Sequence, residues 1–398
     1  MSKIRKILPW FIWTSIIAML IFSYLKPSGL DVALLSEFEC FDSYEKISIN
    51  SDVYRISEKG VNIGYMAFGE AYGYQSDILV GVVISEKGNI LETRIMKQNE
   101  TPSFINKIYN ADFLKRQFKD KPIEEGFTLS KNITAVSGAT ISSRAITSGV
   151  TEASQLIAEG YLNTEVDSHV EIKFGLMEAA LLGMMVLALL SYKLKNQKLR
   201  YLTMSYSIIL LGFKYKQFIA YSWIVSLLLG KAPSFADNIG WYILIVGTVL
   251  FITLTGRNIY CSHICPFGAL QEAGKKLSGF DFFKINPKMN KRFRELPSVL
   301  AYIAFTGAVL TEQMGIVSYE PFSLIYGRTG SGIQWALLPL ILIMSLFVMR
   351  FYCSYACPVG VVLNLSVKAR RFVSDIYRDR GSNKVNEAIL HESKKESA

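Results

Sequence analysis

The sequence Cys261-Ser262-His263-Ile264-Cys265-Pro266 returns almost letter for letter as Cys353-Ser354-Tyr355-Ala356-Cys357-Pro358. These two copies hold four of the five cysteines of the chain. Matched residues flank both copies: Arg257 and Arg350, Tyr260 and Tyr352, and Gly268 and Gly360. We therefore expect two structural units of the same kind.

A proline directly after the second cysteine suits the first turn of a helix, where a backbone N–H is not needed. The partial positive charge at that end of a helix favours a nearby thiolate. Each copy is therefore suited to present two ionised sulfurs. His263 has Tyr355 at the equivalent position, so we do not expect it to be a ligand.

Four cysteines in two matched pairs favour metal ligation over disulfides if they lie in the reducing cytoplasm. Their spacing alone suits a structural zinc ion and an iron–sulfur cluster about equally. The Cys-Pro ending favours iron–sulfur, and so does the position of the pairs at the ends of apolar helices, which need no zinc to stabilise them. We expect Cys261, Cys265, Cys353 and Cys357 to bind one shared iron–sulfur cluster, most simply 4Fe-4S.

The composition predicts a membrane protein. Hydrophobic residues make up 51% of the 398 residues, which is high for a soluble chain. The formal net charge of +10 would suit nucleic acid or an anionic membrane surface, but the basic residues lie beside apolar runs. This placement favours membrane topology and no nucleic-acid partner.

Six apolar runs are candidates for crossing a hydrocarbon core of about 30 Å. The first is preceded by Lys3, Arg5 and Lys6 and is expected to be an anchor; a cleaved signal peptide is the alternative, but the small-residue cleavage pattern is missing. The positive-inside rule places both cysteine copies and the C-terminus in the cytoplasm. The runs are Ile7–Leu25, Phe174–Tyr192, Tyr201–Gly230, Ile239–Thr255, Ser298–Gln313 and Gln334–Met349.

The third run is interrupted by Lys214, Tyr215, Lys216 and Gln217. Charges at that depth are costly and usually face protein or water. The run is either one long, broken crossing whose polar residues line a quinone or cofactor cavity, or a re-entrant bend.

Between the first two runs the composition is that of a soluble, exported domain. Val61–Phe68 and Ile78–Ile84 alternate as strands do, and a turn at Glu86–Asn89 leads into Ile90–Met96, which predicts an antiparallel hairpin. Helical patterns follow at Phe104–Phe118 and Ser142–Tyr161, so the domain is expected to be α+β.

Within this domain, the run Thr134–Ser142 contains Ser137-Gly138-Ala139-Thr140 before a helix. It resembles the flavinylation motif of FMN-binding domains, in which the last threonine carries FMN through a phosphoester bond made by a flavin transferase. Gly73-Tyr74 and Glu100-Thr101-Pro102 also match that domain in order. The resemblance implies covalent FMN at Thr140, a turn shaped by Ser137, Gly138 and Ala139, and an isoalloxazine pocket lined by Glu100 and Thr101.

Together with the cysteine copies, this layout resembles the membrane flavo-iron–sulfur proteins related to the nitrous-oxide-reductase expression regulator. Two departures stand out: the flavinylation motif usually has aspartate where this chain has Thr134, and no ferredoxin-type cysteine runs follow Cys357. The expected organisation is an anchor at 1–27, an extracytoplasmic α+β FMN-binding domain at 28–172, an all-α membrane domain of five helices at 173–368 and a cytoplasmic polar tail at 369–398.

This layout predicts a multi-pass protein of the cell inner membrane that transfers electrons. The expected partners are membrane lipid, the flavin transferase, a cytoplasmic or quinol donor and an extracytoplasmic acceptor. Two other classes stay open, a redox-sensing regulator or assembly factor and a zinc-stapled membrane scaffold. Visible absorption separates iron–sulfur from zinc, and turnover with an acceptor separates a carrier from a sensor.

Overall fold

The computed structural model describes residues 14–22, 25, 38–47, 52–73, 76–100, 102–129, 131–167, 174–230, 232–235, 238–279, 286–311, 319–327 and 332–376. The chain divides into two compact units. One contains Met1–Lys173, Ala220–Asn238 and Tyr302–Leu337, and the other contains Phe174–Ile219, Ile239–Ala301 and Leu338–Ala398.

The first unit contains a five-stranded antiparallel sheet in which each strand pairs with its neighbour in sequence. The predicted hairpin is confirmed, because β4 and β5 pair antiparallel across the Glu86–Asn89 turn. The strands are β1(Ser43–Lys46), β2(Tyr54–Glu58), β3(Val61–Tyr72), β4(Asp77–Ser85) and β5(Ile90–Lys97).

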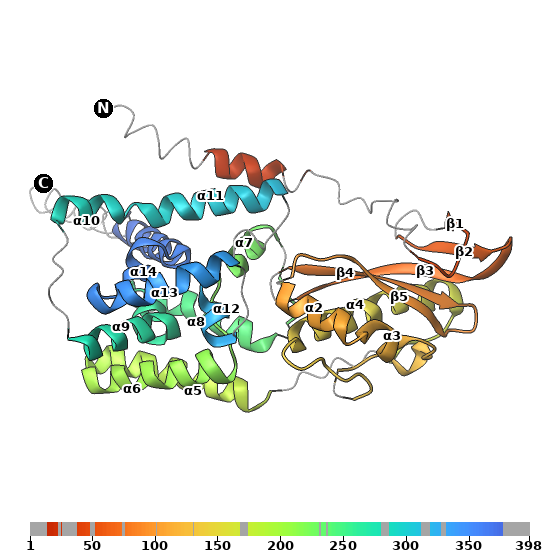
Figure 1. Cartoon of the computed structure of the whole chain (residues 1–398), viewed down its shortest axis with the longest axis horizontal. Helices are drawn as coiled ribbons and strands as arrows, with labels where there is room; N and C mark the ends of the chain where they lie inside the picture. The colour runs from red at the N-terminus through yellow and green to blue at the C-terminus, as the bar shows by residue number, and fades with distance from the viewer. Residues whose placement is uncertain are drawn as a thin grey trace, which may run out of the picture. The chain divides into compact units, whose positions relative to one another are not determined.

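Both faces of the sheet are covered. Side chains alternate across a strand, so Val80, Val82 and Ile84 of β4 point into the core on the helix side, whereas Val83 belongs to a smaller apolar cluster with Ile56. The helices of this domain are α2(Pro102–Asn110), α3(Phe113–Phe118) and α4(Thr140–Ile157). Of these, α4 packs directly against β3 and β4 (Figure 1). The predicted α+β class is confirmed.

Helix α4 approaches the sheet closely at a pair of glycines. A Cβ added to Gly69 of β3 would lie 2.0 Å from the carbonyl oxygen of Gly149 on α4. Any side chain at position 69 would therefore push the helix off the strand, so this contact fixes how closely α4 sits above the sheet.

One predicted helix of this domain is divided. The helical pattern of residues 104–118 is split into α2 and α3 by Ala111 and Asp112, and Asp112 takes a left-handed conformation with φ of 50°. Aspartate tolerates this conformation better than most residues. The chain turns there, so that Ile105, Ile108, Phe113 and Phe118 all reach the same core.

The second unit is helical and carries both cysteine copies. Two of the helices, α11(Leu296–Thr311) and α13(Gly332–Phe347), have residues in both units, and α7(Tyr221–Leu228) and α12(Phe322–Gly327) lie in the first. The remaining helices are α5(Leu176–Leu194), α6(Gln197–Ser207), the π-helix η4(Ile208–Lys214), α8(Ile239–Thr255), the π-helix η5(Tyr260–Ile264), α9(Pro266–Ser278), α10(Pro287–Phe293), α14(Phe351–Tyr355) and residues 358–376.

Two helical segments among the described residues are long and apolar enough to cross a membrane. They are Leu176–Leu194, which is α5, and Pro287–Thr311, which runs from α10 through α11. Ile239–Thr255 and Gln334–Phe347 are apolar but shorter. Most of the predicted anchor lies outside the described residues, and only 14–22 of it form a described helix. The six predicted crossings are thus supported at two places.

The interrupted third run contains a true break. The π-helix η4 ends at Lys214, the next helix begins at Tyr221, and Lys216 between them has a positive φ of 52°. The polar residues that interrupt the apolar pattern therefore coincide with the non-helical segment.

Candidate functional site

Both cysteine copies close with the same backbone hydrogen bond, although residues 260–264 form a π-helix and residues 351–355 an α-helical turn. In the first copy the backbone N–H of Cys265 donates to the carbonyl of Tyr260 at 2.8 Å, and in the second the N–H of Cys357 donates to the carbonyl of Tyr352 at 2.9 Å. Each bond spans five residues and encloses both cysteines of the copy, with a proline directly after it that begins a helix. The expectation of two equivalent units that end in Pro-initiated helices is confirmed.

The sulfurs of the two copies lie close enough to influence one another. Burial, and then the neighbouring sulfurs of Cys265 and Cys353, raises the pKa of the Cys261 thiol. Burial and then Cys265 likewise raises the pKa of Cys353, to about 12. All four of these cysteines are free thiols. Holding them as thiolates therefore requires a strongly cationic partner in the same place.

A glycine lies beside the sulfurs at the matched position of each copy. A Cβ added to Gly268 would lie 3.7 Å from the Cys353 sulfur and 3.8 Å from Cβ of Cys265. A Cβ on Gly360 would lie 3.8 Å from the Cys357 sulfur. Four thiols with glycine at the matched position of each copy fit a cysteine-ligated iron–sulfur cluster.

Structural zinc is the alternative occupant of the four cysteines. A single zinc ion needs all its sulfur ligands about 2.3 Å from one point. Within the described part of the chain, no group of three or more His, Cys, Asp or Glu side chains is placed to hold one metal ion. Metal and sulfide analysis of the purified protein separates a zinc-stapled scaffold from an iron–sulfur protein.

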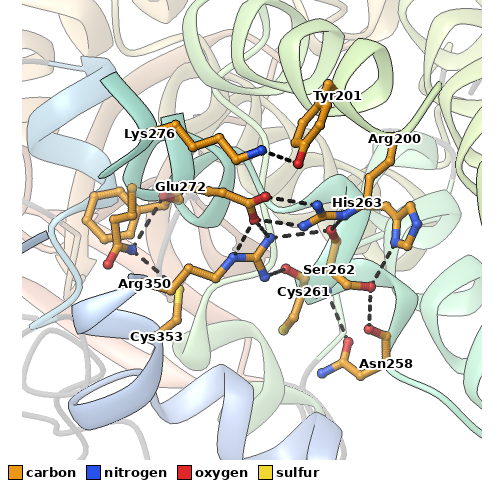
Figure 2. A network of polar contacts seen from close by, with 12 residues as sticks. Arg200, Tyr201, Asn258, Cys261, Ser262, His263, Glu272, Lys276, Arg350 and Cys353 are labelled. Carbon is orange, nitrogen blue, oxygen red and sulfur yellow. Dashed lines mark hydrogen bonds and ion pairs between the residues drawn. The ribbon is translucent and has the colours of Figure 1, made fainter. Parts of the chain in front are cut away.

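A buried ion network holds the two copies together (Figure 2). Glu272 of α9 binds Arg200 through two hydrogen bonds of 2.8 and 2.7 Å, and Arg350 through bonds of 3.0 and 2.7 Å. Arg350 also donates to the carbonyl of Cys261 at 2.8 Å, and Arg200 donates to the carbonyl of Ser262 at 3.2 Å. Arg350, which precedes the second copy, is thus hydrogen-bonded to the backbone of the first copy.

The charge states of this network follow from its contacts. Burial by itself would raise the pKa of the Glu272 carboxyl, but the hydrogen bonds and positive charges of Arg200 and Arg350 outweigh it and hold the pKa below its usual range. Burial and the same two arginines lower the pKa of His263 to about 4, so the imidazole is neutral at physiological pH. Glu272 is therefore the negative centre of the network.

Replacing Glu272 with glutamine should lower the stability of this unit by about 3 kcal/mol, because two arginines then lose the carboxylate that compensates them. The side chain of Glu272 is 2% exposed. The thermal unfolding midpoint of the purified protein, followed by circular dichroism, measures the effect. Glu295→Gln, at an exposed position after α10, is the matched control and should leave the midpoint unchanged. Equal midpoints for the two variants would contradict a stabilising role for the network.

The predicted flavin turn leads directly into α4. Thr140 is the first residue of the helix and is exposed, Ala139 before it is buried, and Gly138 has a positive φ of 75°. The hydroxyl of Ser143 accepts from the backbone N–H of Val136 at 3.1 Å, which fastens the turn to the helix. An exposed hydroxyl at a helix N-terminus is a favourable place for a phosphate.

The second predicted flavin element is held by internal hydrogen bonds. Glu100 is buried, and its two carboxylate oxygens accept from the Ser142 hydroxyl at 2.6 Å and from the backbone N–H of Ser76 at 3.3 Å. A Cβ added to Gly73 would lie 2.6 Å from Glu100 Oε1, which explains the glycine there. Thr101, and Tyr74 after the glycine, lie outside the described residues. Glu100 therefore ties the first turn of α4 to the loop before β4.

Sequence reasoning did not identify several residues of the two sites. The side chain of Lys107 lies over the flavin turn, since a Cβ on Gly138 would meet its Nζ at 2.7 Å. Arg200, Gln271 and Glu272 surround the cysteine copies. The sequence did contain a signal for Gln271 and Glu272. Both are polar residues that lie on the same buried part of α9 as Phe267 and Gly268.

Comparison with known proteins agrees with both sites. A family model described as FMN-binding domain matches residues 73–155, and one described as 4Fe-4S binding domain matches residues 238–286 and 335–375. The first range contains Thr140, and the second contains all four cysteines of the repeat.

Three relatives illustrate the range of similar proteins. Regulatory protein NosR of Pseudomonas aeruginosa is 31% identical over 33% of this chain and 19% of its own length. A component of the proton-translocating ferredoxin:NAD(+) oxidoreductase complex of Clostridium ljungdahlii is 32% identical over 28% of this chain and 63% of its own. Methylamine utilization ferredoxin-type protein MauN of Paracoccus denitrificans is 32% identical over 29% of this chain and 41% of its own.

The chain thus spans about a fifth of NosR and about three fifths of the Clostridium protein. The two domain matches and these relatives confirm the resemblance to NosR-like flavo-iron–sulfur proteins. They support electron transfer with FMN and an iron–sulfur cluster as the cofactors.

Proposed function

We propose that this chain, a flavo-iron–sulfur protein similar to NosR, carries electrons across a cell membrane between a cytoplasmic or quinol donor and an extracytoplasmic acceptor. The observation that carries the proposal is the pair of matched cysteine turns in one unit, in a chain that also holds an FMN-binding domain. A redox centre on each of two domains is the minimum that such a path requires.

The residues of the two sites would have different roles. Cys261, Cys265, Cys353 and Cys357 would ligate the cluster, and the Arg200–Glu272–Arg350 network holds their two loops in register. Thr140 would carry FMN, Ser137, Gly138 and Ala139 would shape its turn, and Lys107 would face its phosphate. When bound, FMN and the cluster supply the electron-accepting and electron-releasing chemistry that no side chain here provides.

The exteriors of the helices support a membrane location. Large apolar side chains stand exposed on α5, α8 and α11, among them Val186, Leu254 and Ile303 at 58%, 64% and 60%. Apolar surface of this kind on a monomer marks a membrane or partner interface. The relative from Clostridium belongs to a proton-translocating complex, and translocation needs a membrane. We place the flavin domain outside the membrane and the cysteine turns on its cytoplasmic side, within six crossings.

The two centres need a connection. The hydrocarbon core is about 30 Å thick, which is a long gap between centres at opposite faces. A quinone, a partner protein or an approach of the flavin domain would complete the path. The second candidate function is regulation, for which the chain would sense redox state through the same cofactors; the name of the relative NosR describes it as a regulatory protein.

Sealed vesicles of known orientation test the proposal. A reductant confined to the cytoplasmic side should bleach the flavin absorbance of the wild-type protein on the far side. The Cys353→Ala protein, which keeps its flavin, should fail to do so. Bleaching that does not depend on the cysteines would favour the sensor, because the flavin would then be served by another route.

Added quinone resolves a negative result. If quinone restores bleaching of the wild-type protein, the missing part is a carrier and the path through the cysteines stands. If bleaching still fails with both cofactors loaded, the proposal that this chain transfers electrons across the membrane is wrong.

A further inference from the structure

The amide of Gln271 contacts the sulfur of a cysteine in the other copy. Its Nε2 lies 3.3 Å from Sγ of Cys353, and 3.4 Å from the carbonyl oxygen of Phe267. Its Oε1 accepts from the backbone N–H of Tyr352 at 2.9 Å. The hydroxyl of Ser345 lies 3.2 Å from Oε1 and 2.6 Å from the carbonyl oxygen of Ile341. This one side chain, on the helix that follows the first copy, thereby contacts Cys353, the residue Tyr352 before it and Ser345 of α13.

The orientation of this amide follows from its partners. Oε1 faces the backbone N–H of Tyr352, which can only donate, and Nε2 faces the carbonyl oxygen of Phe267, which can only accept, so the reverse orientation would set donor against donor and acceptor against acceptor. Gln271 is only 1% exposed, and water does not compete for these bonds. The N–H that points at the sulfur is therefore held in place by the rest of the network.

The hydrogen bond breaks the symmetry of the repeat. Gln271 follows Cys261 at the same distance in sequence as Leu363 follows Cys353, and Leu363 is a buried apolar residue. The helix after the first copy therefore carries an amide donor at this position, whereas the helix after the second copy carries a hydrocarbon side chain.

We propose that Gln271 is a positioning residue that acts through Cys353: its N–H withdraws electron density from this sulfur and makes the ligated centre easier to reduce. The inference rests on the proposed function, because it requires the cysteines to hold a redox centre. Hydrogen bonds to ligand sulfurs are among the factors that set the potentials of iron–sulfur clusters, since reduction adds negative charge that the donor stabilises.

Gln271→Met removes the donor and keeps the length of the side chain. We expect its centre to be reduced about tenfold less readily, which for one electron is a shift of about 59 mV to a more negative potential. Redox titration of the purified full-length protein, followed by visible absorption and electron paramagnetic resonance, measures the potential. Iron and sulfide content are measured on the same samples.

Ser345→Ala is the matched control. It removes the hydroxyl that lies 3.2 Å from Oε1 and leaves the N–H on the sulfur, so its potential should equal that of the wild type. A full complement of iron in Gln271→Met with an unchanged potential would overturn the inference, and so would an equal shift in Ser345→Ala.

A measurement on the wild-type protein covers the case in which Gln271→Met loses its iron. In protein made by cell-free synthesis with glutamine labelled with ¹⁵N at the side-chain nitrogen, pulsed resonance of the reduced centre should show one ¹⁵N coupling. Its absence rejects the hydrogen bond to the sulfur. Wild-type protein that binds no iron and sulfide would instead reject the proposed function itself.

Discussion

Replacing Cys353 alone with alanine should remove the entire iron–sulfur absorption of the protein, not half of it. Both copies close with the same backbone hydrogen bond, and the sulfur of Cys265 raises the pKa of the thiols of both Cys261 and Cys353. If the four cysteines ligate one centre, as proposed, all four are needed to keep it. Visible spectra and iron and sulfide analysis of the purified variant measure the loss.

The same loss should follow from Cys261→Ala and from Cys357→Ala. Cys40→Ala, at the fifth cysteine, is the control and should leave the spectrum and the iron content unchanged. Half the iron in an otherwise normal cluster after any one of the three repeat substitutions would show two separate centres, and a colourless wild type that contains zinc would restore the scaffold alternative.

Thr140→Val should abolish the flavin fluorescence that survives denaturation. Valine has nearly the shape of threonine but no hydroxyl, and the phosphoester implied by the motif needs that oxygen. Thr140 is exposed at the first position of α4, so the substitution leaves the core of the domain intact. Fluorescence of the denatured protein on a gel is the measurement.

Ser43→Ala is the control for this experiment, because it removes an exposed hydroxyl of the same domain at a position outside the flavin turn. It should keep the covalent flavin. Fluorescence that persists in Thr140→Val would place the bond elsewhere. A denatured wild type without fluorescence, although the native protein binds FMN, would mean reversible binding, and Thr134→Asp would then test whether the unusual residue of the motif is the cause.

The sequence predicted those parts of the fold that depend on residues close together in the chain. The β4–β5 hairpin follows from two strand-forming segments on either side of the Glu86–Asn89 turn, and the start of α4 follows from the small residues before Thr140. The division of residues 104–118 was missed because nothing in the helical pattern signals the left-handed conformation of Asp112. The cysteine copies were found because the repeat is nearly literal.

The network around the cysteines was missed because its members come from distant parts of the chain. Arg200 and Arg350 meet at Glu272 only after folding, and no spacing in the sequence connects them. The repeat was even misleading at one position. Arg257 looks like the partner of Arg350, but it lies over the ring of Tyr192, and Asn258 occupies the equivalent position, where it accepts from the backbone N–H of Cys261.

The matched turns also bear on how such a protein could arise. Each turn closes with its own backbone hydrogen bond and carries only two of the four proposed ligands. An ancestral chain with one copy would complete the set only by pairing with a second identical chain about a two-fold axis. Duplication and fusion of the gene would place both copies in one polypeptide. Positions 271 and 363 would then be free to diverge, as glutamine and leucine have done.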